Sequence, residues 1–174
     1  MFEPAPPLFG GIAIVLMCLM CPPAYAQTKV PFFAFVSLDD SSRLISNESM
    51  IGTFYLVDFW ATWCPPCVEG IPGLTATFEK FKARKFQIIS LSFDKSPQAV
   101  ERFRKKRYAM PWIHGFLERG FGDFITTSFN VQNIPHFVLV DDLGFVRKEF
   151  DEIAGSELEG MLESLLPRAE SMQR

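Results

Sequence analysis

The chain has 174 residues, of which 48% are hydrophobic, and its formal net charge is −3. This length is typical of a single domain, and the hydrophobic content is ample for a packed core. The slightly acidic balance argues against a nucleic-acid-binding protein, because such proteins present a strongly basic surface. A basic run from Arg102 to Arg107 lies on a predicted helix beside acidic residues, and a solvated helix face is its simplest interpretation.

Residues 1–26 differ in composition from the rest of the chain. The apolar run from Gly10 to Cys21 is too short to span a membrane as a helix, and Ala24–Ala26 has the pattern of a signal-cleavage site. These features predict a signal peptide over residues 1–26, a single domain over residues 27–174, and export to the periplasm or another extracytoplasmic space. The leading segment contains Glu3 and no Lys or Arg, so an uncleaved membrane anchor is the alternative.

The four cysteines form two close pairs. Cleavage of the signal would remove Cys18 and Cys21 and leave only Cys64 and Cys67. A secreted domain that is stabilised by disulfides normally has several spaced cysteines. The remaining pair must therefore bind a metal, close a loop or exchange electrons as a dithiol.

Four segments in the first half of the domain have strand composition. Pro31–Leu38 is aromatic and β-branched, and Arg43–Ile45 could pair back with it after a turn. Phe54–Trp60 is almost continuously apolar, which is typical of a central strand covered on both faces. Phe86–Phe93 predicts a second buried strand of the same kind.

Two helices are expected between and after these strands. The first should begin at Pro65, because proline is tolerated in a first turn, and Pro72 inside it should produce a kink. The second should begin at Ser96 and Pro97. The residues that face the core are expected to be Ile71, Leu74, Phe78 and Phe81 in the first helix, and Val100 and Phe103 in the second.

From Tyr108 to Asn133 the sequence indicates secondary structure less clearly. Gly120–Val131 is predicted as a short helix with an inner face of Phe121, Phe124, Ile125 and Phe129. A hairpin of Phe137–Val140 and Phe145–Phe150 follows, and Ser156–Leu166 forms a last amphipathic helix. This order predicts an α/β fold with a central mixed sheet and helices on both faces.

The placement of Cys64 just before a helix has chemical consequences. Its sulfur would face unpaired N–H groups at the positive end of the helix dipole, which favours the thiolate. Cys67 follows three residues later on the same face, within reach of a disulfide. This arrangement is typical of a dithiol in which the second cysteine resolves the mixed disulfide formed by the first.

The segments "LVDFWATWCPPC" and "NIPHFVLVD", with Pro72 between them, resemble the thioredoxin superfamily. The N-terminal strands and the long stretch before Asn133 are most similar to its exported TlpA-like (ResA/TlpA-type) thiol–disulfide oxidoreductases. The resemblance covers Pro31 to Leu166. It implies a thioredoxin-like fold with an N-terminal strand extension, and a thioredoxin-like oxidoreductase activity.

The resemblance also implies roles for individual residues. Cys64 would attack the substrate, Cys67 would resolve, and the two would form a redox-active Cys64–Cys67 disulfide. Pro135 matches the cis-proline of the family, and Trp63 with Ile134 and Pro135 would hold the substrate strand. Trp60 and Trp112 are expected to be packing residues.

Asp58 is a carboxylate within the predicted central strand. Such a group is costly unless it is protonated or paired, and the resemblance implies that it moves the proton of the resolving cysteine. An acid bonded to backbone or water at a strand end is the alternative. The lysine that thioredoxins often place beside this acid is missing, and Ser90 or Ser92 stands there instead.

The two histidines have different contexts. His136 follows Pro135 and could lie close enough to tune the Cys64 thiolate, or it could be a partly exposed residue at a strand start. His114 is expected to be structural.

The sequence supports three other functions less well. A closed zinc site needs four ligands, whereas the cysteine pair supplies two. A thiol peroxidase is suggested by Ser90–Asp94, but the proline expected upstream of a peroxidatic cysteine is absent. A non-catalytic binding module would be expected to lose one cysteine.

Within dithiol chemistry, a reductant of protein disulfides, as in cytochrome c maturation, is favoured over an oxidant that introduces them. A reductant outside the cytoplasm would need a membrane electron donor. No cofactor-binding motif is visible, so no cofactor, no metal and no nucleic-acid partner are expected, and a monomer is expected.

Overall fold

The computed structural model describes residues 28–152 and 155–166. The predicted signal peptide, residues 1–26, lies outside the described residues, so its cleavage and the boundary at residue 27 stay predictions. Within the described part of the chain, no helix has the length and apolar character needed to cross a membrane.

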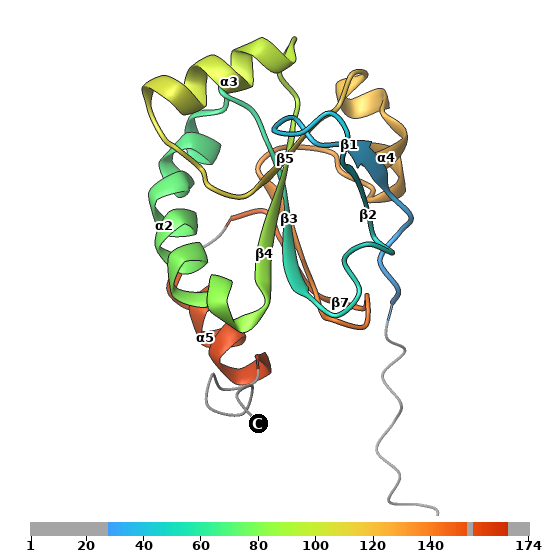
Figure 1. Cartoon of the computed structure of the whole chain (residues 1–174), viewed down its shortest axis with the longest axis vertical. Helices are drawn as coiled ribbons and strands as arrows, with labels where there is room; N and C mark the ends of the chain where they lie inside the picture. Colours follow the sequence, from blue (N-terminus) through green and yellow to red (C-terminus); the bar gives the residue numbers. More distant parts are fainter. Residues whose placement is uncertain (1–27, 153–154, 167–174) are drawn as a thin grey trace, which may run out of the picture.

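The centre of the molecule is a five-stranded mixed sheet in the order β5-β4-β3-β6-β7 (Figure 1). Its strands are β3 (Phe54–Trp60), β4 (Phe86–Ser92), β5 (Ile113–Phe116), β6 (His136–Val140) and β7 (Val146–Phe150). Strand β3 runs parallel to β4 and antiparallel to β6. All seven residues of β3 are buried, as its continuous apolar sequence predicts. The predicted mixed α/β sheet is therefore confirmed.

The edge strand β5 was not expected from the sequence. It has only four residues, and its His114 and Gly115 are weak strand formers. Tertiary packing requires the glycine, because a Cβ at Gly115 would lie 2.5 Å from the ring of Phe35 and 2.7 Å from Leu91. The close approach of the N-terminal layer to the sheet thus selects glycine within this strand.

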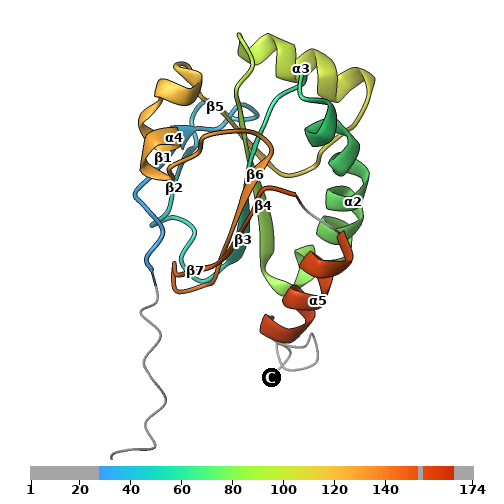
Figure 2. The ribbon, with the colours of Figure 1, turned by 180° about the vertical axis from the view of Figure 1, so that it is seen from behind.

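Elements cover both faces of the sheet, as expected (Figures 1 and 2). One face carries α2 (Pro65–Phe81), the short 3₁₀ helix η2 (Lys82–Arg84), α3 (Pro97–Lys106) and α5 (Gly155–Leu165). The other carries the two-stranded antiparallel sheet of β1 (Ala34–Val36) and β2 (Leu44–Ser46), together with α4 (Phe124–Ser128). The pairing of β1 with β2 confirms the predicted N-terminal strand extension.

The alternation of side chains along β3 assigns residues to these two faces. Phe59 contacts Phe129 at the end of α4, with ring centroids 5.3 Å apart. Trp60 points the opposite way and contacts Phe103 of α3 at 5.6 Å. Because successive side chains point to opposite faces, Asp58 lies on the same side as Trp60, beneath the helices. Trp60 is buried, in agreement with its expected packing role.

The segment before β6 corrects the expectation of one helix over Gly120–Val131. A 3₁₀ turn, η3 (Gly120–Gly122), precedes α4, which begins after Asp123 as its N-cap. Ile125 and Phe129 are buried as predicted, but Phe121 and Phe124 are 46% and 63% exposed. The predicted inner face is wrong for these two residues because the 3.6-residue period does not continue across the turn and the new cap.

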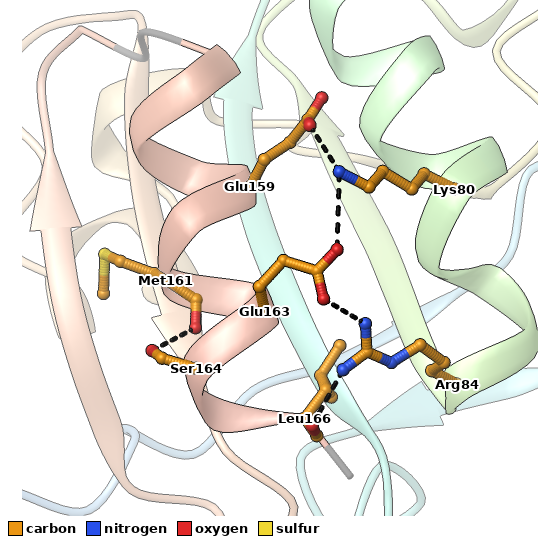
Figure 3. Close-up of polar contacts among 7 residues, drawn as sticks. All are labelled: Lys80, Arg84, Glu159, Met161, Glu163, Ser164 and Leu166. Atoms are coloured by element: carbon orange, nitrogen blue, oxygen red, sulfur yellow. Dashed lines mark hydrogen bonds and ion pairs between the residues drawn. The ribbon is translucent and has the colours of Figure 1, made fainter. Parts of the chain in front are cut away.

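A network of ion pairs connects helix α5 to the C-terminal end of α2 and to η2 (Figure 3). Lys80 contacts Glu159 at 2.9 Å and Glu163 at 3.4 Å, and Arg84 contacts Glu163 at 2.6 Å. Arg84 also donates to the carbonyl of Leu166 at 2.8 Å. These contacts lie at the C-terminal end of α2 and in η2, at the opposite end of α2 from Cys64.

Candidate active site

The dithiol lies at the N-terminus of α2. Cys64 is the N-cap residue, with extended backbone (φ −96°, ψ 103°), and its sulfur accepts a hydrogen bond from the backbone N–H of Cys67 at 3.3 Å. Pro65 and Pro66 occupy the first turn, as predicted. The two sulfurs form a disulfide, and the Cα atoms of Cys64 and Cys67 are 5.3 Å apart.

This position determines the electrostatics of Cys64 when the disulfide is reduced. The first N–H groups of a helix have no intrahelical carbonyl partner and carry the positive end of the helix dipole. The sulfur of Cys64 already accepts one of these groups. A negative sulfur at this place is therefore stabilised relative to a free cysteine thiolate, which favours reactivity.

The surface beside the dithiol presents one large aromatic side chain. Cys64 and Cys67 are 4% and 5% exposed, whereas the neighbouring Trp63 is 57% exposed. A shallow pocket of about 210 Å³ adjoins them and is lined by Thr62, Trp63, Pro65, Val68, Glu69 and Arg107. The exposure of Trp63 agrees with its expected place at the border of the site.

Asp58 lies in the buried layer between the sheet and α2, and it is 3% exposed. Ser90, its register neighbour on β4, donates a hydrogen bond of 2.6 Å to Oδ2 of Asp58. Trp112 donates through Nε1 to the hydroxyl of Ser90 at 2.8 Å. Burial raises the pKa of Asp58 to about 7, and the hydrogen bond from Ser90 partly opposes this rise.

Asp58 accepts this hydrogen bond from a side chain, whereas the alternative interpretation had the acid bonded to backbone or water. Trp112 is buried, as expected of a packing residue, and stacks edge-to-face on Phe78 of α2 at 5.6 Å. Its indole also orients the serine, a role that the sequence did not reveal. Because an indole N–H can only donate, the Ser90 hydroxyl accepts from Trp112 and directs its own hydrogen to Asp58.

His114 continues this buried row on β5, where it is the register neighbour of Ser90. Its Nε2 lies 3.0 Å from the carbonyl of Met110, and its ring stacks on Trp112. Burial lowers the pKa of His114 to about 4, and the positive charge of Arg104 acts in the same direction. A neutral, fully buried histidine with these contacts has the structural role that was expected.

A second buried carboxylate, Asp94, holds the loop that leads to Cys64. The backbone N–H of Thr62 donates to Asp94 Oδ2 at 3.0 Å, and the Thr62 hydroxyl donates to Oδ1 at 2.5 Å. Ser92 adds a third hydrogen bond, to Oδ2 at 2.8 Å. The loop is thereby tied to the end of β4. Nothing in the sequence indicated this role of Asp94, because its partner is 32 residues away.

The peptide bond between Ile134 and Pro135 is cis, as the resemblance implied. His136 begins β6 directly after it, and its Nδ1 lies 3.0 Å from Asp151 Oδ1. The ring of His136 also lies 6.0 Å from that of Phe59. These contacts describe a largely buried histidine at a strand start, and a tuning effect on Cys64 stays a prediction. Within residues 28–152 and 155–166, no cluster of three or more His, Cys, Asp or Glu is placed to hold a metal ion.

Known proteins are similar to this chain in sequence and in fold. The family model for Thioredoxin-like proteins matches residues 52–146. The thiol-disulfide oxidoreductase ResA of Bacillus thuringiensis subsp. konkukian is 30% identical over 134 residues, which cover 77% of this chain and 73% of that protein. A protein of the same name from Bacillus cereus is 29% identical over 134 residues, which cover 76% of this chain and 75% of that protein.

A solved structure supports the same fold. The thioredoxin domain of a thiol-disulfide oxidoreductase from Bacteroides vulgatus superposes with a TM-score of 0.71 at 23% identity, and the match covers 83% of this chain and all of that domain. The thioredoxin-like fold expected from the sequence is thereby confirmed, and the ResA relatives confirm the expected oxidoreductase class. The chain belongs to the thioredoxin-like family.

Proposed function

We propose that this protein exchanges electrons with disulfides of other proteins through Cys64 and Cys67. The observation that carries this proposal is the position of the Cys64 sulfur, which caps α2 and lies in a disulfide with Cys67. A thiolate is favoured there when the pair is reduced, and a resolving thiol is already within bonding distance.

In the direction of reduction, the Cys64 thiolate attacks one sulfur of the substrate disulfide. A mixed disulfide forms, and the other substrate sulfur leaves as a thiolate that takes up a proton. Cys67 then loses its proton and attacks the Cys64 sulfur, which releases the second substrate thiol. Two electrons pass to the substrate, and the protein is left with the Cys64–Cys67 disulfide.

Asp58 is the proposed acceptor of the Cys67 proton. It lies on the face of the sheet that α2 covers, and burial raises its pKa to about 7. A group with such a pKa binds and releases protons readily near neutral pH, which suits a general acid and base. Ser90 donates to Oδ2 of Asp58, so the proton is expected on Oδ1.

Trp63, Ile134 and Pro135 are the proposed contacts of the substrate strand. Trp63 supplies exposed aromatic surface next to Cys64, and the cis bond sets the path of the chain into β6. His136 is proposed to tune Cys64 from the start of β6, where Asp151 orients its ring.

The proposed direction is reduction, and it is supported by likeness to the ResA proteins. A protein exported by residues 1–26 would then depend on a membrane electron donor. The monomeric state is likewise a proposal. A disulfide-introducing oxidant is the alternative. The peroxidase alternative is weakened because the Thr62 hydroxyl donates to Asp94 and is thus engaged away from the thiolate.

Single-cysteine variants and a redox titration test the proposal. We expect Cys64→Ser to abolish reduction of a peptide disulfide, and Cys67→Ser to accumulate mixed disulfides that mass spectrometry detects. Equal activity of the two variants would contradict the assigned order. In a glutathione series, a reduction potential of the Cys64–Cys67 pair of about −270 mV would support a reductant, and one of about −120 mV would support an oxidant. Consumption of hydrogen peroxide faster than of the disulfide would support the peroxidase.

A further inference from the structure

The second half of α3 and the residue that follows it carry four exposed basic residues, here called the α3 basic surface: Arg102, Lys105, Lys106 and Arg107. Among the described residues, none of the four has a carboxylate partner in an ion pair. Arg104 of the same helix differs, because it is half-buried and contacts Asp39 at 2.6 Å. The surface is thus a local excess of positive charge on a chain whose net charge is −3.

The helix itself explains part of this charge. Cations in the last turn of a helix interact favourably with the negative end of its dipole. This effect does not explain the place of Arg107, which follows the last helical residue and lines the pocket beside Trp63 and Pro65. The guanidinium of Arg107 lies 5.9 Å from the ring of Phe103 and 5.6 Å from that of Tyr108. Stacking on two rings restricts this side chain and holds its charge near the dithiol.

The fold brings α3 close to the start of α2. Helix α3 lies across the end of the molecule where α2 begins, in both views of the ribbon (Figures 1 and 2). The pocket that Arg107 lines is also lined by Pro65 and Val68, which stand next to Cys64 and Cys67 in the chain, and by the acidic residue Glu69. A protein whose sulfur reaches Cys64 therefore passes close to Arg107, the member of the α3 basic surface that lines this pocket.

We propose that the α3 basic surface binds an acidic segment of the protein partner that exchanges disulfides with Cys64. This inference rests on the proposed function and deepens it by naming the charge of the partner. The sulfur of Cys64 is almost buried, so collisions in a random orientation rarely bring it to a partner sulfur. Opposite charge beside the dithiol orients the partner and raises the rate of productive encounter.

Three synthetic peptides test the proposal with the full chain in its reduced form. Each contains the same disulfide, flanked by Asp and Glu, by Ser and Gly, or by Lys. Rate constants of exchange are measured by rapid acid quench and mass spectrometry at low and at high salt. We expect the acidic peptide to react about tenfold faster than the neutral one at low salt, and this ratio to approach one at high salt.

A double variant, Lys105→Gln with Arg107→Gln, connects the preference to the surface. It should reduce the ratio of acidic to neutral rate constants by about threefold or more at low salt. The matched control is Lys82→Gln with Lys85→Gln, which removes two charges at the other end of α2. These positions are about 25 Å from the dithiol along a 17-residue helix, beyond the Debye length of about 10 Å when the low-salt measurement is made at about 0.1 M. The control should leave the ratio unchanged.

The outcomes separate this inference from the proposed function. Exchange with all three peptides at equal rates would overturn the inference and leave the function intact. Exchange with none of them would overturn the function. Equal rates together with binding of the chain to phosphatidylglycerol vesicles, lost in the Lys105→Gln and Arg107→Gln variant, would assign the surface to a membrane and overturn the acidic partner.

Discussion

The hydroxyl of Ser90 donates a hydrogen bond of 2.6 Å to Oδ2 of Asp58, and both side chains are buried between β4, β3 and α2. The partner of this carboxylate is thus a neutral donor and not a cation. A neutral hydrogen bond offsets only part of the cost of burying a charge, so the pKa of Asp58 stays raised at about 7. A lysine at the same place would have lowered the pKa of Asp58.

Replacement of Asp58 should change how stability depends on pH. Between pH 4 and pH 7 the folded state retains the Asp58 proton, whereas the unfolded chain has lost it. The contribution of Asp58 to stability therefore decreases as pH rises through this window and does not change above it. A rise in pKa from 3.8 to about 7 corresponds to a loss of about 4 kcal/mol.

We expect Asp58→Asn to remove most of this decrease and to raise the free energy of unfolding at pH 8. Urea denaturation of the oxidised protein at pH 5 and pH 8 measures both quantities. An Asp58→Asn variant with the pH dependence of the parent would show that another group causes it. The same variant should slow the release of mixed disulfides at neutral pH, because Cys67 loses its proton acceptor.

Removal of the Ser90 hydroxyl should raise the pKa of Asp58 further. Ser90→Ala removes the hydrogen bond that favours the ionised carboxylate and leaves the indole N–H of Trp112 without its acceptor. The titration of the Asp58 carboxyl carbon, followed by NMR, should move to higher pH. Thr77→Val is the control, because the Thr77 hydroxyl is buried and makes no hydrogen bond within the described residues. It should leave the Asp58 titration in place.

Asp94 should be required to hold the loop before Cys64. Asp94→Ala leaves the N–H and hydroxyl of Thr62 without their acceptors, and should destabilise the protein by about 1–3 kcal/mol and slow disulfide exchange. Asp94→Asn keeps an acceptor and a donor and should recover part of the exchange rate. Asp40 is an exposed acid whose carboxylate, among the described residues, accepts hydrogen bonds from Ser42, so Asp40→Ala should change stability and exchange little. Chemical denaturation and exchange kinetics check all three variants.

Gly115 should not tolerate a larger side chain. A Cβ there would meet the rings and methyl groups of Phe35 and Leu91 at 2.5–2.7 Å, so Gly115→Ala should cost about 1–3 kcal/mol. Gly73 offers a matched control inside α2, where nothing lies within 4 Å of an added Cβ. Gly73→Ala should stabilise the protein by about 0.5–1 kcal/mol through helix propensity. Equal effects of the two substitutions in thermal unfolding would contradict the close packing of β1 on β5.

Much of the fold follows from patterns between residues near each other in the chain. The apolar run of Phe54–Trp60 and the prolines after Cys64 indicate a buried strand that leads into a helix, and both are present. Strand β5 and the start of α4 were missed or misplaced. The edge strand is too short and too poor in strand-forming residues, and the cap at Asp123 resets the helical period.

The sequence by itself determined the dithiol and its electrostatics, because a cysteine that caps a helix acquires them from the residues next to it. Only the tertiary structure decided what surrounds it. Ser90 reaches Asp58, Asp94 reaches Thr62 and Arg107 reaches the pocket beside Trp63 across 32 residues or more. These contacts depend on strand register and on the placement of α3 at the end of the molecule where α2 begins, which are set by burial of the whole core and not by any local pattern.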